Sequence, residues 1–183
     1  MKTILWQIQS SARELKRTRV IAAAGMLIAL SVLFSLFNIV LSEVLQISFS
    51  FLPIAAGGML FGPVVGALMG VAGDILGYFA HSNGPFFPGF TLSALLSGAF
   101  YGFMLYGKPL TGKRVLAVSA VVALVVNLVL YSLWLSIMYG KAFVPLMGAR
   151  ALKNAVMLPV DAFMLYFILK IADRFRVQSR IRE

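Results

Sequence analysis

Long apolar stretches follow one another along almost the whole chain, and polar residues are confined to short intervals between them. Most of these stretches approach the roughly 20 mainly apolar residues that a helix needs to cross a bilayer. The pattern predicts six membrane-spanning helices, at residues 20–41, 50–61, 63–80, 90–106, 115–139 and 151–171. The second and third are short, and Pro63 between them forbids an unbroken helix. We therefore expect an all-α, polytopic membrane protein.

The composition agrees with this fold class. Of the 183 residues, 61% are hydrophobic and 12% are charged, whereas soluble domains are about 25% charged. The length leaves room for six spans and short connections, so we expect a single membrane domain over residues 1–183. Its expected parts are a basic segment (1–19), a six-helix core (20–171) and a basic tail (172–183). We expect no cleaved signal peptide, because the first apolar stretch starts only after Arg19.

Basic residues predict the orientation in the membrane. The net charge is +10, and thirteen of the sixteen Lys and Arg residues lie on one side of the membrane if six spans alternate. These thirteen form three clusters: Lys2, Arg13, Lys16, Arg17 and Arg19; Lys108, Lys113 and Arg114; Lys170, Arg174, Arg176, Arg180 and Arg182. The positive-inside rule then places both termini in the cytoplasm. The clusters indicate cytoplasmic flanks rather than nucleic-acid binding.

Five charged residues do not fit this simple picture. Lys141, Arg150 and Lys153 lie around the last external loop. They either snorkel to external headgroups or form a cationic pocket for an anionic ligand, since charges near lipid often mark function. Asp74 and Asp161 lie inside spans, and Asp161 is eleven residues beyond Arg150 and on about the same helix face. Asp161 either pairs with the nearby bases or helps to bind an amino or amide group of a ligand.

Signatures of catalysis are missing. Gly107 to Lys113 matches the first seven positions of a P-loop, but Arg114 stands where Ser or Thr must hold magnesium. If transport is driven by ATP, the ATPase is therefore a different chain. Cysteine is absent, His81 is the single histidine, and the six acidic residues are scattered. We expect no enzymatic activity, no metal and no cofactor.

Two stretches suit a ligand with a flat polar ring and an anionic tail. The external loop before the fourth span carries Phe86 and Phe87, which form either an interfacial aromatic belt or the wall of a pocket in which rings stack. In the fifth span, Asn127 and Trp134 are seven residues apart on one face, with Lys141 seven further on. This row combines a polar, an aromatic and a cationic group.

Small residues recur at intervals of four, which places them on one helix face and lets helix backbones approach closely. The longest series is Gly58, Gly62, Gly66 and Gly70, and Gly98 and Gly102 repeat its spacing. We expect these glycines to pack helices within the protein. Gly25 and Ala29 have the same spacing in the first span, where contact with another protein competes with internal packing.

Four blocks of sequence, taken together and in order, resemble the folate-type S components of energy-coupling-factor (ECF) transporters. The blocks are Ile47-Ser-Phe-Ser-Phe-Leu-Pro-Ile-Ala-Ala-Gly-Gly-Met-Leu-Phe-Gly-Pro63, Gly84-Pro-Phe-Phe-Pro-Gly-Phe-Thr-Leu-Ser-Ala-Leu-Leu-Ser-Gly98, Asn127-Leu-Val-Leu-Tyr-Ser-Leu-Trp-Leu-Ser-Ile-Met-Tyr-Gly-Lys-Ala-Phe143 and Lys153-Asn-Ala-Val-Met-Leu-Pro159. The resemblance extends from about residue 19 to about residue 170. The first block is shared widely among S components, and the last two point to folate.

The resemblance implies a six-helix S component in a bacterial plasma membrane. Such a subunit captures folate outside the cell and docks on a separate transmembrane T component that carries two ATPases. The resemblance places in the folate pocket Phe86, Phe87, Thr91, Trp134, Lys141, Arg150 and Asn154, to which the polar row adds Asn127. Gly25 and Ala29 occupy the positions of the docking motif, which is often a pair of alanines.

Three other interpretations stay open. The chain could be an S component for another vitamin, such as pantothenate or riboflavin. A membrane enzyme acting on lipid would lose turnover when Asp74 and Asp161 are replaced. A structural or assembly subunit would bind no small molecule at all.

Overall fold

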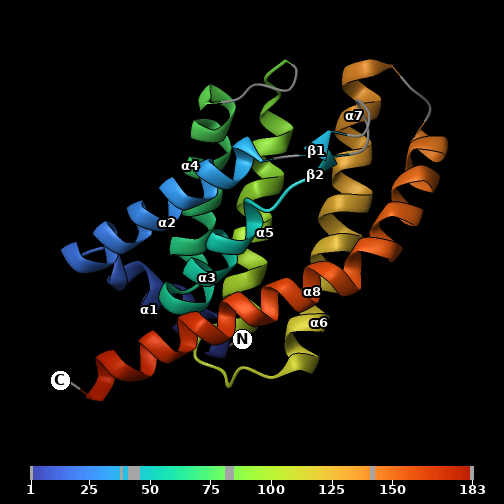
Figure 1. The fold of residues 1–183 in the computed structure, drawn as a ribbon. Helices are drawn as coiled ribbons and strands as arrows, with labels where there is room; N and C mark the ends of the chain where they lie inside the picture. The colour runs from blue at the N-terminus through green and yellow to red at the C-terminus, as the bar shows by residue number, and fades with distance from the viewer. Residues whose placement is uncertain (1, 38, 41–45, 81–84, 141–142, 182–183) are drawn as a thin grey trace.

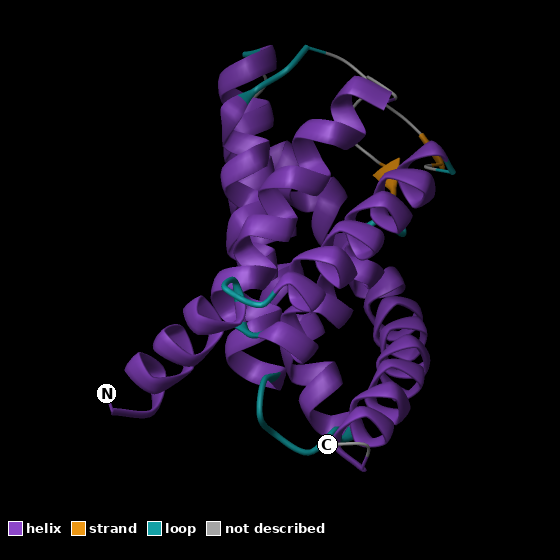
Figure 2. Cartoon of the chain, turned by 90° about the vertical axis from the view of Figure 1, so that its left-hand side faces the viewer, coloured by secondary structure: helices purple, strands orange, loops and turns teal. Residues whose placement is uncertain are grey.

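The protein is a bundle of helices joined by short connections (Figure 1). The computed structural model describes residues 2–37, 39–40, 46–80, 85–140 and 143–181. The helices are α1 (Lys2–Glu14), α2 (Thr18–Leu36), α3 (Phe51–Phe61), α4 (Pro63–Ala80), α5 (Pro88–Leu105), α6 (Gly112–Val121), the π-helix η1 (Val122–Leu130), α7 (Tyr131–Tyr139) and α8 (Phe143–Ile181). Between α2 and α3, the two-residue strands β1 (Ile39–Val40) and β2 (Gln46–Ile47) pair antiparallel (Figure 2).

Five of the six expected spans are helices long and apolar enough to cross a membrane. These are Thr18–Leu36, Pro63–Ala80, Pro88–Leu105, Gly112–Tyr139 and Arg150–Arg174. The remaining one, expected at 50–61, is α3. Its 11 residues rise only about 16 Å along the helix axis, whereas the hydrocarbon core of a bilayer is about 30 Å thick. The described residues thus contain five full-length spans and one short apolar helix.

The short helix α3 lies inside the bundle, in contact with α2, α4, α5 and α8. Every residue from Leu52 to Met59 is buried, as expected for a helix that is apolar on all sides. Gly62 ends α3 with φ of 94°, a backbone conformation that favours glycine. Pro63 then begins α4, a position at which proline lacks no needed hydrogen bond. The break predicted between these two helices is confirmed.

Glycines allow α4 and α5 to pack with their backbones almost touching. A Cβ atom added at Gly98 would overlap the carbonyl group of Gly66, and one added at Gly70 would overlap the carbonyl group of Ala94. Any larger residue at these positions would force the two helices apart. The later glycines of the four-residue pattern therefore pack helices inside the protein, as predicted.

Three helix boundaries differ by five residues or more from those predicted, and one of them is the end of the last helix, which reaches Ile181 rather than 171. The first span ends at Leu36 rather than at 41. The last helix begins at Phe143, so the external loop predicted over 140–150 is wrong for most of its length. Pro145 and Gly148 in this stretch are typical of loops, yet Pro145 lies in the first turn of α8, where proline does not break a helix. Figure 1 shows that α8 changes direction along its length; Pro159 lies inside it and removes one hydrogen bond of the helix.

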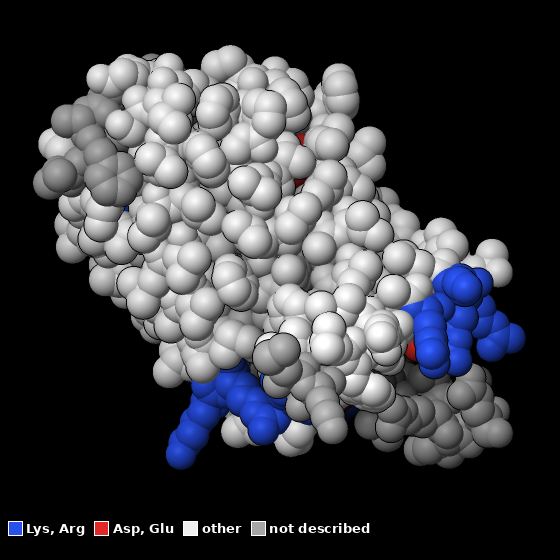
Figure 3. Space-filling model, turned by 180° about the vertical axis from the view of Figure 1, so that it is seen from behind, with Lys and Arg blue, Asp and Glu red and all other residues white. Residues whose placement is uncertain are grey.

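Basic side chains gather at one end of the molecule. On the face drawn in Figure 3, the Lys and Arg side chains lie mainly at that end, and most of the remaining surface is uncharged. Helix α1, the connection between α5 and α6, and the last turns of α8 lie at this end in Figure 1. We refer to it below as the basic end.

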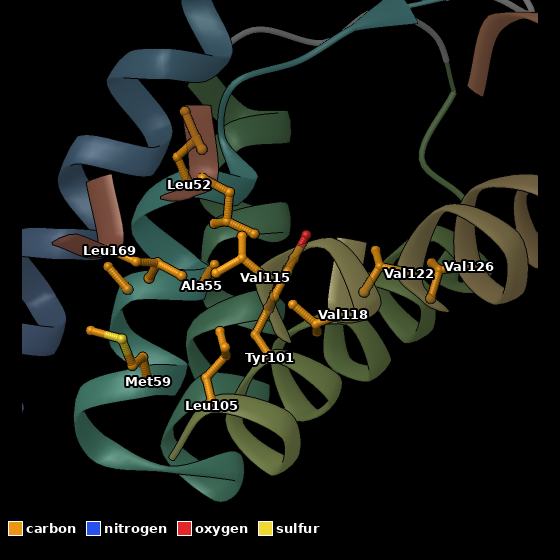
Figure 4. Packing of buried hydrophobic residues seen from close by; sticks show 12 residues of the cluster. Leu52, Ala55, Met59, Tyr101, Leu105, Val115, Val118, Val122, Val126 and Leu169 are labelled. Carbon is orange, nitrogen blue, oxygen red and sulfur yellow. The ribbon is translucent and has the colours of Figure 1, made fainter. Parts of the chain in front are cut away.

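Buried apolar side chains of α3, α5, α6, η1 and α8 form the main core (Figure 4). They are Leu52, Ala55, Ala56, Met59, Tyr101, Leu105, Val115, Val118, Val122, Val126, Leu165 and Leu169. Two of them, Tyr101 and Val122, also line the cavity described next. The core therefore forms part of the cavity wall.

Candidate ligand-binding cavity

A cavity of about 360 Å³ lies among helices α2 to α8. This volume falls within the range of about 300–1,000 Å³ that is usual for small-molecule sites. Its wall carries serine hydroxyls, aromatic rings, the acids Asp74 and Asp161, and the bases Arg150 and Lys153. A cavity with acids and bases in one apolar frame can bind a molecule that carries both hydrogen-bond donors and anionic groups.

One wall of the cavity is acidic. Asp74 of α4 lines the cavity, and Thr91 of α5 donates a hydrogen bond of 2.7 Å from its Oγ1 to Asp74 Oδ2. This bond satisfies one acceptor site on the carboxylate, and an ionised carboxylate has about four. Asp74 therefore retains capacity to accept hydrogen bonds from a ligand.

The opposite chemistry comes from α8. Arg150 and Asn154 are one helical turn apart and both line the cavity. Arg150 Nη1 donates to the backbone carbonyl of Asn127 at 3.0 Å, and its guanidinium carbon lies 5.3 Å from the ring centre of Tyr131. Asn154 Nδ2 donates to the carbonyl of Ala123 at 3.3 Å. These contacts hold the arginine, which is only 9% exposed, at the cavity wall.

The two carbonyls that accept these bonds belong to a π-helix. Residues Val122–Leu130 form η1, whose turns are wider than those of an α-helix because each hydrogen bond spans five residues. Such segments are rare and occur frequently at functional sites. Because Arg150 and Asn154 bind its carbonyls, α8 and η1 form one connected wall. No pattern in the sequence predicted this widened segment.

Aromatic side chains form a connected cluster beside the cavity. Ring centres are 5.8 Å apart for Phe87 and Trp134, 5.9 Å for Phe87 and Phe90, and 5.1 Å for Phe90 and Tyr131. Trp134 Nε1 donates to Ser93 Oγ at 3.0 Å. Phe90 and Tyr131 are the members of this cluster that line the cavity. Phe87 packs against Phe90, and Trp134 packs against Phe87.

Comparison with known proteins identifies the family of the chain. The sequence profile of the family described as "ECF transporter, substrate-specific component" matches residues 19–172. The chain belongs to this family. Its resemblance to S components is thereby confirmed, and it is a multi-pass membrane protein that acts as a transporter subunit rather than as an enzyme. The lipid-enzyme interpretation is therefore excluded.

Individual relatives of this S component carry more specific names. The "Folate transporter FolT" of Clostridium novyi (strain NT) is 34% identical over 167 residues, which cover 91% of this chain and 97% of that protein. The protein of the same name from Leuconostoc mesenteroides subsp. mesenteroides is 31% identical over 158 residues, which cover 83% of this chain and 85% of that protein. A crystal structure of FolT bound with folic acid superposes with a TM-score of 0.78 at 35% identity, covering 84% of this chain and 94% of that one.

The residues predicted to bind ligand fall into two groups in this S component. Those in the cavity wall are Asn127, Arg150 and Asn154. Those outside the wall are Phe86, Phe87, Thr91 and Trp134. Three of these four contact a residue of the wall: Phe86 packs on Tyr78 with ring centres 5.2 Å apart, Phe87 packs on Phe90, and Thr91 donates a hydrogen bond to Asp74. Trp134 contacts Phe87. Lys141 and His81 lie outside the described residues.

Several residues of the cavity wall went unrecognised in the sequence. Ser31 and Ser35 of α2 line it, with Ser48 and Ser50, and Ser31 Oγ donates to the carbonyl of Ser50 at 2.8 Å. Two serines four residues apart in an otherwise apolar span were the available signal. Within the described part of the chain, no group of three or more His, Cys, Asp or Glu side chains could hold a metal ion.

Proposed function

We propose that this S component binds folate at the outer face of a bacterial plasma membrane and delivers it inward, docked on a T component with two ATPase subunits. One combined observation carries the proposal. The chain is 35% identical to a structure of FolT bound with folic acid. Its own cavity is lined by Asp74 on α4 and by Arg150, Lys153 and Asp161 on α8.

The charges in the cavity complement folate. Folate has a flat pterin ring with amide and amino hydrogens at one end and a glutamate with two carboxylates at the other. Asp74 offers an acceptor for the pterin hydrogens. Arg150 offers a planar fork that can engage a carboxylate through two hydrogen bonds, and Lys153 adds a second positive charge. The two positive charges of this wall favour an anionic ligand over a neutral vitamin.

Aromatic residues of the cavity wall and the other predicted residues complete the site in this proposal. Phe90 and Tyr131 are the rings against which the pterin or the benzoyl ring of folate would stack. Phe86, Phe87 and Trp134 belong to the surrounding aromatic residues in this proposal, and Asn127 and Asn154 make polar contacts. Thr91 supports Asp74, and Lys141 binds the anionic tail of folate.

We also propose six membrane segments, with α3 as a short sixth segment enclosed by the other helices. Both termini are then cytoplasmic. The gathering of Lys and Arg side chains at the basic end supports this orientation (Figure 3), because cytoplasmic flanks carry the excess of positive charge.

The face of α2 that carries Gly25 and Ala29 is the proposed docking surface for the T component. Both residues are exposed, and a Cβ atom added at Gly25 would meet nothing within 4 Å. Two exposed small residues one turn apart leave a flat strip against which a partner helix can pack closely.

Calorimetry of folate binding to the purified, detergent-solubilised chain tests the proposal. Arg150→Ala removes the guanidinium from the cavity, and Arg174→Ala is its matched control, since Arg174 is exposed on the same helix. Loss of a charge-assisted bond, worth about 1.5–3 kcal/mol, should weaken folate binding about 10- to 100-fold in Arg150→Ala. Arg174→Ala should bind as the wild type does.

The same titrations with pantothenate and riboflavin separate the alternatives. Stoichiometric binding of one of these without folate binding would retain the S component and replace its substrate. If the folded protein, checked by its helical circular dichroism, binds none of the three, the proposed function is wrong.

A further inference from the structure

Helix α1 buries two polar side chains against the protein and exposes its large apolar ones. Two of its polar side chains face the protein, where Gln7 is 5% and Ser11 0% exposed, whereas Gln9 and Arg13 are exposed. Its large apolar side chains face outward, with Ile4, Leu5 and Trp6 exposed by 52%, 55% and 58%. In water, such a helix would normally turn its apolar side to the core.

Hydrogen bonds hold α1 in this orientation. Ser11 Oγ donates to the carbonyl of Phe61 at 2.8 Å and accepts from the backbone N–H groups of Val64 and Val65 at 3.1 and 3.2 Å. It thereby satisfies two donors of the first turn of α4, which have no partner within that helix. On the same side of α1, Gln7 Nε2 donates to the carbonyl of Tyr106 at 3.3 Å.

The outward side of α1 has the features of a helix that lies in a membrane interface. Such helices combine an apolar side with basic residues that attract anionic lipid, and tryptophan favours the headgroup level. Here Trp6 is exposed beside Ile4 and Leu5. Two exposed bases lie further along the chain, Arg13 within α1 and Lys16 just after it. The 13 residues of α1 reach only about 20 Å, too short to cross the bilayer.

The surroundings of α1 point to lipid as its partner. It packs on α4 at the basic end, and the next helix, α2, exposes the apolar side chains Ile21, Met26 and Leu33. The helix that follows α1 in the chain is thus of membrane-spanning length and has an apolar surface. The excess of Arg and Lys there complements the anionic headgroups of a bilayer surface.

We propose that α1 is an interfacial anchor that lies in an anionic bilayer surface at the basic end, with Ile4, Leu5 and Trp6 inserted at the headgroup level. Through Ser11, this anchor ties the membrane surface to the junction of α3 and α4. The site is separate from the cavity and does not depend on the identity of the substrate.

Fluorescence quenching by lipid tests the anchor. The chain has two tryptophans, Trp6 and Trp134, so Trp134→Phe leaves Trp6 as the only one. The full chain is reconstituted in vesicles of phosphatidylethanolamine and phosphatidylglycerol that contain phosphatidylcholine brominated either near the headgroup or near the end of the acyl chains. We expect loss of Trp6 emission, greater with the shallow bromines. Emission unchanged by both lipids would overturn the proposal.

Two further arms make the result independent of a single variant. Subtracting the emission spectrum of the Trp6→Phe variant from that of the wild type gives the emission of Trp6 in a chain that retains Trp134. This difference should show the same loss of emission with brominated lipid. In anionic vesicles, the double variant Arg13→Gln/Lys16→Gln should lose less emission than the chain without these two substitutions. In vesicles of phosphatidylcholine alone, the two proteins should lose the same emission. Trp6 emission that ignores brominated lipid but changes with the protein-to-lipid ratio would reassign the face to a second copy of the chain and overturn the anchor.

Discussion

Thr91 Oγ1 donates a hydrogen bond of 2.7 Å to Asp74 Oδ2 and so joins α5 to α4 at the wall of the cavity. Thr91 was predicted from the sequence as a ligand residue, but it lies outside the cavity lining, whereas Asp74 lies within it. We therefore expect its effect on a ligand to pass through the carboxylate that it holds in place.

Replacing Thr91 with valine should weaken folate binding although Thr91 is not in the wall. Valine keeps the shape but cannot donate, and Asp74 would lose both its hydrogen bond and its orientation. A lost bond to a charged group, worth about 1.5 kcal/mol or more, predicts a Kd raised by about tenfold. Thr91→Ser, which retains the hydroxyl, should bind nearly as the wild type. Equal affinities of the valine and serine variants in calorimetry would show that the bond plays no part in binding.

Replacing Asp74 with asparagine should reduce the affinity for the pterin end of folate in particular. The amide has nearly the same size but lacks the negative charge that strengthens hydrogen bonds from a pterin. We expect folate binding to weaken at least about tenfold, corresponding to about 1.4 kcal/mol. Binding of p-aminobenzoylglutamate, which lacks the pterin, should change little. If both ligands lose affinity equally, Asp74 supports the fold of the cavity rather than the pterin.

Arg150 should show the reverse preference. Arg150→Ala removes the guanidinium that is proposed to bind the glutamate carboxylates, so folate should bind less tightly. Pteroate, which ends before the glutamate, should lose much less affinity than folate does. Because Arg150 also donates to the carbonyl of Asn127, the thermal stability of the variant is measured in parallel. An equal loss for folate and pteroate would assign Arg150 to holding η1 in place.

The sequence predicts most of the helices because lipid imposes a simple rule on them. A span must be apolar over its whole length, so hydropathy alone locates α2, α4, α5 and α6–α7. For α8, hydropathy locates the membrane span Arg150–Arg174 but not the start of the helix at Phe143, because Pro145 and Gly148 in its first turns are residues typical of loops. It also cannot show that α3 is enclosed by protein, because a buried helix and a lipid-facing helix are both apolar.

The cavity was predicted only in part, for a different reason. Helical spacing places Arg150 and Asp161 on about the same face, and both do line the cavity. What spacing cannot show is the partner of a side chain: Thr91 is bound to Asp74, and Trp134 to Ser93. The π-helix was not predictable either, because its widened turns arise from a shift in backbone hydrogen bonding that leaves the apolar pattern intact.

The contact between α4 and α5 should tolerate no added methyl group. Gly98→Ala places a Cβ atom against the carbonyl of Gly66, and overpacking of this kind typically costs about 1–3 kcal/mol. We therefore expect a lower thermal unfolding temperature in detergent. Gly25→Ala is the control, since a methyl group there meets nothing within 4 Å, and it should leave stability unchanged or raise it slightly. Equal unfolding temperatures for both variants would mean that α4 and α5 separate freely.

Enlarging the small face of α2 should separate docking from substrate binding. Ala29→Leu adds a bulky side chain at an exposed position, where it does not enter the cavity. The isolated variant should bind folate with wild-type affinity, yet it should fail to co-purify with the T component and the ATPases, and cells that depend on it should not take up folate. Ala155→Leu is the matched control, because Ala155 is exposed on α8 and the substitution adds a side chain of the same size. Normal assembly of the Ala29 variant, or loss of assembly in both, would remove α2 as the docking surface.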